Sequence, residues 1–458
     1  MIKRILIGAL LMFAACEAYA LDVVYPKQKT VTINSPSTFF IGSSDYSQPL
    51  YINDNIVEVH PSGGFAQTVP LAVGENNFTI KSGNSILNYK IIRPKQKSDV
   101  SVSEFKKYDT PKYIISKSNG MPLRTTPVDA GINRLAHLQS GVVMIADGEQ
   151  DDFYRIKLGD DNYGWFAKSY AEINSKAQND VFLTGANIDS DDEFYIYTFN
   201  LTSRVPWSVE ENGDTLDISI YNVVNAPKDN FYRIKVPLDK ILYGKDLIGY
   251  SAYYSGTDFI VKIRKPLNIS EDKPLKDVKI AIDAGHGGSE FGATGCLGDY
   301  EKDINLKYAK DLYHSLKSRG ADVIMIREKD EDVALKTRTE KANEEGAVIF
   351  ISLHGNALPD YKDPLAIHGT EIYYYYKQAK PLAAAIMSAM ITEAEVKNNG
   401  IIQQSFAVVR NTNALSILIE IGYLINPYDN AQIIDNEFRK KAVEAISDGL
   451  ENYLRGQI

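Results

Sequence analysis

At positions 278–288 the chain reads VKIAIDAGHGG, and at positions 348–357 it reads VIFISLHGNA. Each stretch is an apolar run rich in β-branched residues, as in a buried strand, and each ends in a histidine followed by glycine. In an open α/β sheet, ligands bind just beyond the carboxyl ends of the strands. Because the chain holds only six histidines, two in equivalent positions are informative. We expect His286 and His354 to belong to one metal site.

A third metal ligand is expected at Glu301, the first residue of a predicted helix over 301–319. Positions 301, 304, 308 and 312 share one face of that helix, and the last three are Ile, Tyr and Leu. A carboxylate on such an apolar stripe is buried, and buried carboxylates are paired or bind metal. An ordinary surface glutamate would lie on the side that carries lysines such as Lys302.

Two histidines and one glutamate match a catalytic zinc site, in which a fourth position stays open. We therefore predict one Zn²⁺ in this part of the chain. Either histidine alone would more often be a core or surface residue, and the matched strand ends together with Glu301 favour the metal. The remaining histidines are interpreted as bystanders: His60, His137, His314 and His368.

Glu420 is the predicted general base. It interrupts the apolar stretch LIEIGYLIN at 418–426, with isoleucine on both sides. A buried, unpaired glutamate has a raised pKa, which suits a group that carries protons near neutrality. The alternative is a salt-bridged core glutamate.

From residue 277 onward, strand-like and helix-like segments alternate. This pattern predicts an α/β domain with a mixed, mostly parallel sheet flanked by helices. The expected strands are 279–284, 321–326, 347–353, 370–376 and 415–421, and the expected helices are 301–319, 334–345 and 381–395.

The preceding part of the chain is predicted to be β-rich and modular, because alternating apolar and polar residues are divided by polar stretches near 93–110, 172–180 and 266–276. Residues 22–95 contain GGF at 63–65 and GEN at 74–76, and on this rhythm they resemble a bacterial Ig-like β-sandwich. Residues 111–172 contain LRTTP at 123–127 and a closing GW at 164–165, and on these residues they resemble a bacterial SH3-like β-barrel, a module that typically binds cell-wall peptide or glycan. Residues 180–266 alternate in the same way and contain RVPW at 204–207, and on this pattern they resemble a β-rich targeting module found ahead of some wall amidases. Which module binds wall stays open.

Residues 1–20 have the three parts of a secretory signal peptide: a basic start, an apolar run over 5–15 and an Ala-x-Ala site at 18–20. We expect export to the periplasm or cell envelope. Lipoprotein anchoring through Cys16 is the alternative, since residues 13–16 resemble a lipoprotein box. Loss of Cys16 would leave Cys296 as the sole cysteine and exclude an intrachain disulfide.

The bulk properties exclude some classes of function. A length of 458 residues is too great for one core, so the chain is expected to be multidomain. The net charge of -9 argues against a nucleic-acid partner. Beyond residue 21 no segment is apolar enough to predict a transmembrane helix.

Four motifs in order, DAGHGG at 283–288, EKDINL at 301–306, SLHGNA at 352–357 and IEIGYLIN at 419–426, resemble the zinc-dependent N-acetylmuramoyl-L-alanine amidases of the Amidase_3 type. The resemblance covers residues 277–456. It implies that His286, Glu301 and His354 bind zinc, that Glu420 is catalytic, and that the substrate is peptidoglycan, cut between N-acetylmuramic acid and L-alanine. Arg327, Arg338 and Asn343 also match the family and are interpreted as structural or substrate-positioning.

The resemblance has one departure and leaves alternatives open. Some family members carry a long insertion after the second histidine that forms a helix blocking the zinc, and the short segment 358–367 leaves little room for one. We therefore hypothesise that the N-terminal modules or substrate access limit activity. A protein activator is a further candidate partner. Another zinc amide hydrolase, either a peptidoglycan peptidase or a sugar deacetylase, and a non-catalytic wall-binding protein remain alternatives.

Overall fold

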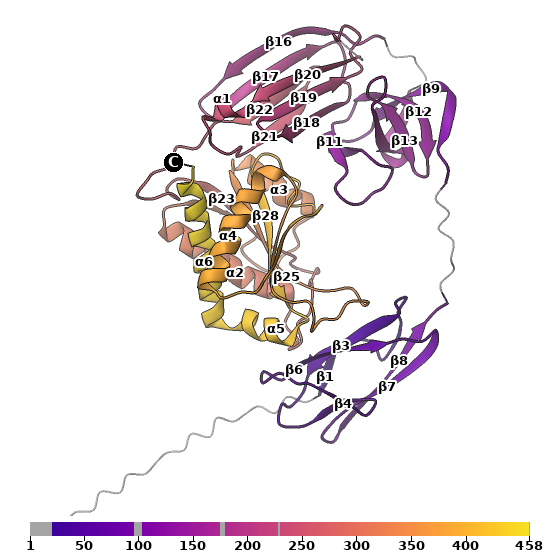
Figure 1. The fold of residues 1–458 in the computed structure, drawn as a ribbon, viewed down its shortest axis with the longest axis vertical. Helices are drawn as coiled ribbons and strands as arrows, with labels where there is room; N and C mark the ends of the chain where they lie inside the picture. The colour runs from indigo at the N-terminus through magenta and orange to yellow at the C-terminus, as the bar shows by residue number, and fades with distance from the viewer. Residues whose placement is uncertain (1–20, 96–102, 175–178, 228–229, 458) are drawn as a thin grey trace, which may run out of the picture.

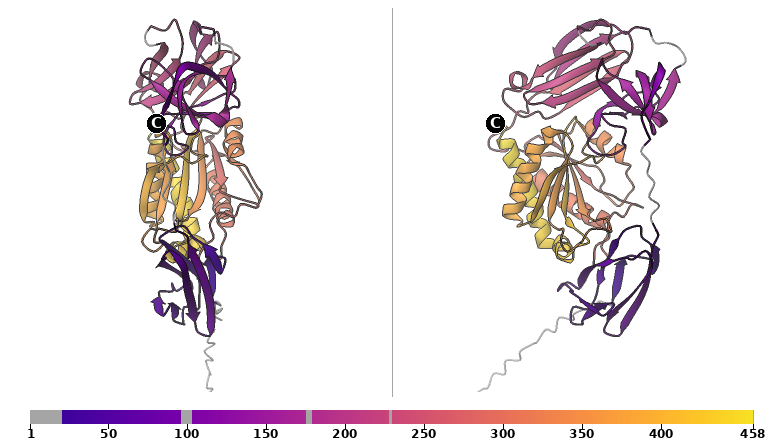
Figure 2. Two further views of the ribbon diagram at one scale, coloured as in Figure 1. Left: turned by 90° about the vertical axis from the view of Figure 1, so that its right-hand side faces the viewer. Right: turned by 45° about the vertical axis from the view of Figure 1, so that its right-hand side comes forward.

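The computed structural model describes residues 21–95, 103–174, 179–227 and 230–457. An α/β domain formed by the C-terminal part occupies the middle of the molecule (Figure 1). One β-sandwich lies at one end of this domain, and the other β-rich parts lie at its opposite end; a second direction of view shows the same arrangement (Figure 2). Within the described residues, no helix combines the length and apolarity needed to cross a bilayer.

The α/β domain contains a six-stranded sheet in the order β24-β23-β25-β28-β26-β27. Its strands are β23 (Lys279–Ala284), β24 (Asp322–Met325), β25 (Ile349–Asn356), β26 (Thr370–Tyr374), β27 (Asn398–Gln403) and β28 (Leu415–Tyr423). Neighbouring strands pair in parallel, except β26 and β28, which are antiparallel. The helices are α2 (Glu301–Ser318), α3 (Leu335–Glu344), α4 (Lys380–Glu393), α5 (Pro427–Ile434) and α6 (Asn436–Arg455), with the short η2 (Lys377–Ala379) before α4.

The two faces of this sheet enter different cores, which explains why its central strands are apolar throughout. Ile349 and Ile351 of β25 pack in the large core that also holds side chains of α2, α4 and α6. Phe350, between them, points to the opposite face and packs with Ala342 of α3. Because side chains alternate along a strand, His354 lies on the face of Phe350.

The N-terminal part is a sandwich of two sheets, with orders β1-β3-β6 and β2-β8-β7-β4-β5. Its strands are β1 (Asp22–Tyr25), β2 (Thr30–Thr32), β3 (Ser37–Ser43), β4 (Leu50–Ile52), β5 (Asn55–Val57), β6 (Gly64–Pro70), β7 (Gly74–Ser82) and β8 (Ser85–Arg93). Phe40 of β3 is buried in the core between the sheets. Its neighbours Phe39 and Ile41 point the other way and are also buried.

The middle part contains a seven-stranded sheet in the order β11-β10-β14-β13-β12-β9-β15. Its elements are β9 (Lys106–Ser116), β10 (Met121–Arg124), β11 (Arg134–Leu138), β12 (Val143–Gln150), β13 (Phe153–Lys157), β14 (Tyr163–Ala167), η1 (Lys168–Tyr170) and β15 (Ala171–Asn174). Strand β9 begins inside the stretch expected to be a linker, because the backbone of Lys106 and Lys107 pairs with β12 despite the polar side chains.

Two further sheets follow, β16-β17-β22-β21 and β18-β19-β20. Their elements are β16 (Leu183–Ser190), β17 (Phe194–Leu201), β18 (Trp207–Asn212), β19 (Thr215–Tyr221), β20 (Phe231–Pro237), α1 (Leu238–Leu242), β21 (Tyr250–Ser255) and β22 (Asp258–Arg264). The assignment of the three β-rich parts to Ig-like, SH3-like and targeting-like modules stays a prediction.

The β-rich parts contact the α/β domain at both ends of its sheet. Phe39 and Ile41 of the sandwich pack against Cys296, Tyr423 and Ile425, close to the carboxyl end of β28. At the opposite end, before β28 begins, the backbone N–H of Tyr250 donates to the carbonyl of Thr412 at 2.7 Å. The N-terminal sandwich therefore lies at the end of the sheet where ligands are expected.

Polar contacts join the sandwich to the segment that follows His354. The Tyr25 hydroxyl donates to Asp360 Oδ1 at 2.6 Å, and the Thr38 hydroxyl donates to the same oxygen at 2.7 Å. A further hydrogen bond, 3.1 Å long, runs from Thr68 to Asp363. The segment 358–367, in which no plug was expected, is thus held against the sandwich.

Candidate metal centre

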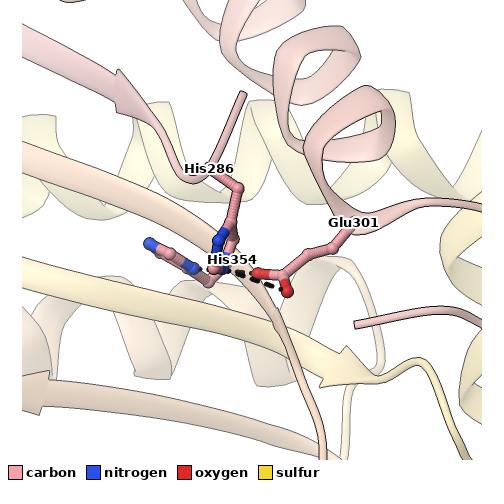
Figure 3. Close-up of side chains that lie close together, drawn as sticks. All are labelled: His286, Glu301 and His354. Atoms are coloured by element: carbon pink, nitrogen blue, oxygen red, sulfur yellow. Dashed lines mark hydrogen bonds and ion pairs between the residues drawn. The ribbon is translucent and has the colours of Figure 1, made fainter. Parts of the chain in front are cut away.

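The side chains of His286, Glu301 and His354 come together at the carboxyl ends of β23 and β25. His286 follows β23, Glu301 begins α2, and His354 lies near the end of β25. Potential ligand atoms of the three residues all lie within 4.8 Å of one another. Glu301 points one oxygen toward each histidine (Figure 3): Oε1 lies 2.8 Å from His354 Nδ1 and Oε2 lies 3.2 Å from His286 Nε2. Two imidazoles and a carboxylate form a donor set that fits a divalent metal such as zinc.

Glu301 is buried, with 4% of its surface exposed, and its hydrogen bonds keep it ionised. Its Oε2 accepts the backbone N–H of Ala293 at 2.7 Å, and its Oε1 accepts that of Gly355 at 3.2 Å. Burial by itself raises the pKa of Glu301, but the hydrogen bonds and charges of His286 and His354 outweigh burial and hold the pKa well below its usual range. The carboxylate therefore joins the loop before α2 to the turn after His354.

The loop that carries His286 adopts a backbone conformation that requires glycine beside it. His286 itself has φ of 59°, in the left-handed region. A Cβ on Gly285 would lie 2.2 Å from Cε1 of His354, so only glycine lets the two histidines approach this closely. A Cβ on Gly292 would lie 2.3 Å from Glu301 Oε2.

Two buried arginines donate hydrogen bonds to this loop. Arg338 donates to Asp283 Oδ1 at 2.6 Å and to the carbonyl of His286 at 2.9 Å. Arg327 donates to the carbonyls of Ala284 and Gly285 at 2.8 and 3.0 Å. Both guanidinium groups bind backbone of the loop, which is a structural task. Asn343 lies apart from them, and its Oδ1 accepts a hydrogen bond from Asn411.

Lys302 differs from the expectation that it marks the solvent side of α2. The residue is buried, and its ammonium donates to the carbonyl of Gly288 at 2.9 Å and to Asp330 Oδ2 at 2.7 Å. The apolar face of α2 is buried, as its periodicity predicts, but the loops that carry Gly288 and Asp330 also cover the opposite side of its first turn.

Glu420 lies on the strand next to His354, and the two residues are partners in the β25–β28 register. Its side chain is 8% exposed, and its Oε2 is buried without a hydrogen-bond partner in the described part of the chain. Burial first, and then the charges of Glu301 and Glu371, raise the pKa of Glu420 well above its ordinary value. Glu420 is therefore no salt-bridged core residue.

Glu371 is a second buried carboxylate at the site, and sequence reasoning missed it. It is the register partner of Glu420 in the antiparallel β26–β28 pair. Unlike Glu420 it is fully hydrogen-bonded: it accepts from Asn356 Nδ2 at 2.8 Å, from Asn399 Nδ2 at 2.6 Å and from the Tyr373 hydroxyl. The available signal was the one that identified Glu420, a glutamate interrupting an apolar strand.

The other candidate ligands lie elsewhere. Cys296 is buried in the sandwich interface, where burial raises the pKa of its thiol and its Sγ contacts the carbonyl of Ile425 at 3.3 Å. His314 is exposed on α2, and His368 lies 3.4 Å from Asp429. His60 packs on the Tyr428 ring. Burial, and then the charges of Arg134, Arg410 and Arg124, lower the pKa of His137 to about 4. Within the described residues, none of these joins the group of three.

A family model and curated relatives match part of this chain. Residues 280–452 match the family model described as N-acetylmuramoyl-L-alanine amidase, Amidase_3. The uncharacterized protein YqiI of Bacillus subtilis is 31% identical over 185 residues, which cover 40% of this chain and 87% of YqiI. This chain belongs to the Amidase_3 family. "Probable cell wall amidase LytH" of Staphylococcus epidermidis is 37% identical over 194 residues, or 41% of this chain and 64% of LytH. The chain thus spans about two thirds of the length of LytH.

Two solved amidase structures each match 39% of this chain. The catalytic domain of CwlV from Bacillus (Paenibacillus) polymyxa var. colistinus is 32% identical in sequence, with a TM-score of 0.37. The match covers 39% of this chain and 98% of the CwlV chain. An N-acetylmuramoyl-L-alanine amidase from Clostridium difficile 630 is 33% identical in sequence, with the same TM-score of 0.37. The match covers 39% of this chain and 97% of the Clostridium difficile chain.

Proposed function

We propose that this chain is a peptidoglycan hydrolase that cleaves the amide bond between N-acetylmuramic acid and L-alanine. His286, Glu301 and His354 would hold one Zn²⁺, and Glu420 would be the catalytic general base. The observation that carries the proposal is the convergence of three ligand side chains beside a buried, unpaired carboxylate. Membership of the Amidase_3 family selects the bond among those that such a site can cut.

Each residue has a defined task in this reaction. Zinc bound by the three side chains would polarise the scissile carbonyl and acidify an attacking water. Glu420 takes the proton from that water and returns it to the departing amine of L-alanine. Its raised pKa suits both steps, because the carboxyl can hold a proton near neutrality. Glu301 and the arginine-held loop keep the two imidazoles in place.

Product analysis tests the proposal. Purified peptidoglycan is digested with the protein, with and without a zinc chelator, and the released fragments are identified by mass. We expect peptide stems with a free L-alanine amino terminus, and none in the presence of chelator. Cut cross-links would indicate a peptidase, and released acetate would indicate a deacetylase. A complete lack of products would favour a required activator or a wall-binding role.

We also propose that the protein works in the cell envelope, where peptidoglycan lies. The name of LytH, a probable cell wall amidase, supports this location. The predicted signal peptide at residues 1–20, including Cys16, lies outside the described residues. The N-terminal residue of the mature protein, identified by mass spectrometry, distinguishes periplasmic export from lipoprotein anchoring through Cys16.

The hypothesis that the N-terminal modules limit activity can be tested with Phe39→Asp. This substitution removes a buried ring from the sandwich interface, worth about 3–5 kcal/mol of packing, and adds a charge. It should detach the sandwich while leaving its own core, around Phe40, intact. We expect faster peptidoglycan digestion if the sandwich restricts access.

Small-angle scattering verifies detachment, and Ile56→Asp, at an exposed site on β5, is the matched control. Digestion that slows in Phe39→Asp would contradict the hypothesis and assign the sandwich a supporting role. Such a point variant is preferable to a fragment starting near Asp277, because the fragment would expose Tyr423 and Ile425 to water.

A further inference from the structure

Asn305 is a buried polar side chain of α2 to which the proposed reaction gives no task. It lies one turn after Glu301, and none of its surface is exposed. Its neighbours Ile304 and Tyr308 belong to the large apolar core. Side chains at such positions are ordinarily apolar, because an amide taken out of water loses its hydration. Packing alone therefore does not explain an asparagine at this position.

The amide nitrogen of Asn305 joins the two elements that carry Glu301 and His286. Its Nδ2 donates to Glu301 Oε1 at 3.3 Å, and to the carbonyl of Gly285 at 3.2 Å. A carboxylate and a carbonyl can only accept, so the nitrogen of the amide, and not its oxygen, must face them. Asn305 thus contacts one expected metal ligand directly and the residue that precedes another.

The oxygen of the same amide has no partner. Oδ1 of Asn305 is buried without a hydrogen bond in the part of the chain that the structure describes. A buried acceptor without a donor costs free energy, and in native proteins such a group frequently has a functional reason. Asn411, which is also buried, shows the ordinary arrangement. Its Nδ2 donates to Asn343 Oδ1 at 2.9 Å, and its Oδ1 accepts the backbone N–H of Asn413 at 3.1 Å.

The two acceptors that Asn305 binds have other donors as well. The carbonyl of Gly285 also accepts from Arg327 Nη2 at 3.0 Å, and Glu301 Oε1 also accepts the backbone N–H of Gly355 at 3.2 Å. An alanine at position 305 would leave neither acceptor without a hydrogen bond. It would also remove the unpaired Oδ1 and supply a better helix former. What it would break is the direct link between Glu301 and the loop at Gly285.

This link is relevant to metal binding because Glu301 has to be oriented by groups other than the metal ligands. The contacts that Glu301 makes with His286 and His354 come from side chains that are themselves expected to bind the metal. Among the described residues, the other donors to Oε1 are the backbone N–H of Gly355 and the amide of Asn305. Hydrogen bonds from such outer groups orient metal ligands and raise the affinity for the metal.

We propose that Asn305 is a positioning residue of the metal centre, which fixes Glu301 relative to the loop of His286 and thereby raises the affinity for zinc. The inference rests on the zinc site of the proposed function. It also explains why a half-satisfied amide occurs in an apolar core: a group can serve a site at the expense of stability. An asparagine that served only the fold would instead stabilise the metal-free protein.

Asn305→Ala tests the proposal through two measurements on the full chain. Competition with a chromophoric chelator should show a zinc affinity lowered by roughly 10–100-fold, the loss expected for an outer-shell partner. Tm of the metal-free variant should equal or exceed that of the metal-free parent, because no acceptor loses its last donor and the unpaired Oδ1 is gone. An unchanged zinc affinity, or a lower Tm, would overturn the proposal.

Asn411→Ala is the matched control, since it removes a buried asparagine whose amide is hydrogen-bonded at both atoms. It should lower Tm and leave zinc affinity unchanged. If Asn305→Ala does not fold, Asn305→Ser offers a hydroxyl too short to reach both acceptors. We expect the same loss of affinity from Asn305→Ser, and an unchanged affinity would refute the proposal. A parent chain that binds no zinc would contradict the metal site itself, whereas equal zinc binding by parent and variant would contradict only the role of Asn305.

Discussion

Glu420→Gln should lower kcat for peptidoglycan hydrolysis by roughly 10²–10⁴-fold, the range that a positioned general base contributes. Glutamine has nearly the shape of a protonated glutamate but cannot take a proton from water. Zinc content should be unchanged, since Glu420 is not among the three residues that converge on the metal position. The exposed Glu437, on α6, provides the control Glu437→Gln.

The same substitution should stabilise the metal-free protein at neutral pH. In the unfolded chain Glu420 ionises at about pH 4.3, whereas in the folded chain burial, then Glu301 and Glu371, raise the pKa. Between these two pKa values the folded state binds more protons, so the free energy of unfolding falls as pH rises. Glutamine does not ionise, so the free energy of unfolding of the variant does not fall in this way as pH rises. Tm of both proteins, measured with chelator from pH 4 upward, should coincide at the acid end and diverge toward pH 7; curves that stay parallel would contradict the raised pKa.

Glu301→Gln should weaken zinc binding by more than the roughly 10–100-fold that loss of an outer-shell partner costs. Its carboxylate faces both histidines and also accepts the backbone N–H groups of Ala293 and Gly355. Removing the charge therefore weakens the metal site and the loops that shape it. Competition with a chromophoric chelator measures the affinity.

Excess zinc distinguishes the two variants. Activity of Glu301→Gln should partly return at high zinc concentration, whereas Glu420→Gln should stay inactive at any concentration. Asp303→Asn, with an exposed side chain on the same helix, should bind zinc like the parent. Unchanged zinc affinity in Glu301→Gln would remove Glu301 from the proposed ligands.

The α/β domain and the core of its site were predictable because their signals are local. Strand-terminal His-Gly pairs, and glutamates at Glu301 and Glu420 where apolar residues belong, are visible in short stretches of sequence. Spacing alone could show which face of α2 is buried, but not that loops around Gly288 and Asp330 also cover Lys302. The last two helices and β27 were not predicted as separate elements.

Contacts between modules could not be predicted, because their partners are distant in sequence. The hydrogen bond from Tyr25 to Asp360 and the hydrogen bond from the backbone N–H of Arg134 to the Tyr375 hydroxyl join residues of different modules. One signal was present: the run Phe39-Phe40-Ile41 does not alternate, and such a strand is covered on both faces. The sequence thus indicates that a second surface covers this strand, and only the structure identifies that surface as the α/β domain.

The apolar clusters of the molecule do not follow the module boundaries. One continuous core runs from Ile114 to Ile263 and includes side chains of both the seven-stranded part and the two sheets after it. Ile248, from the same region, packs in the core of the α/β domain. Contacts of this kind couple the melting of neighbouring modules. In a calorimeter the protein should unfold in fewer cooperative transitions than it has modules, so a destabilising change in one module lowers the thermal tolerance of its neighbours as well.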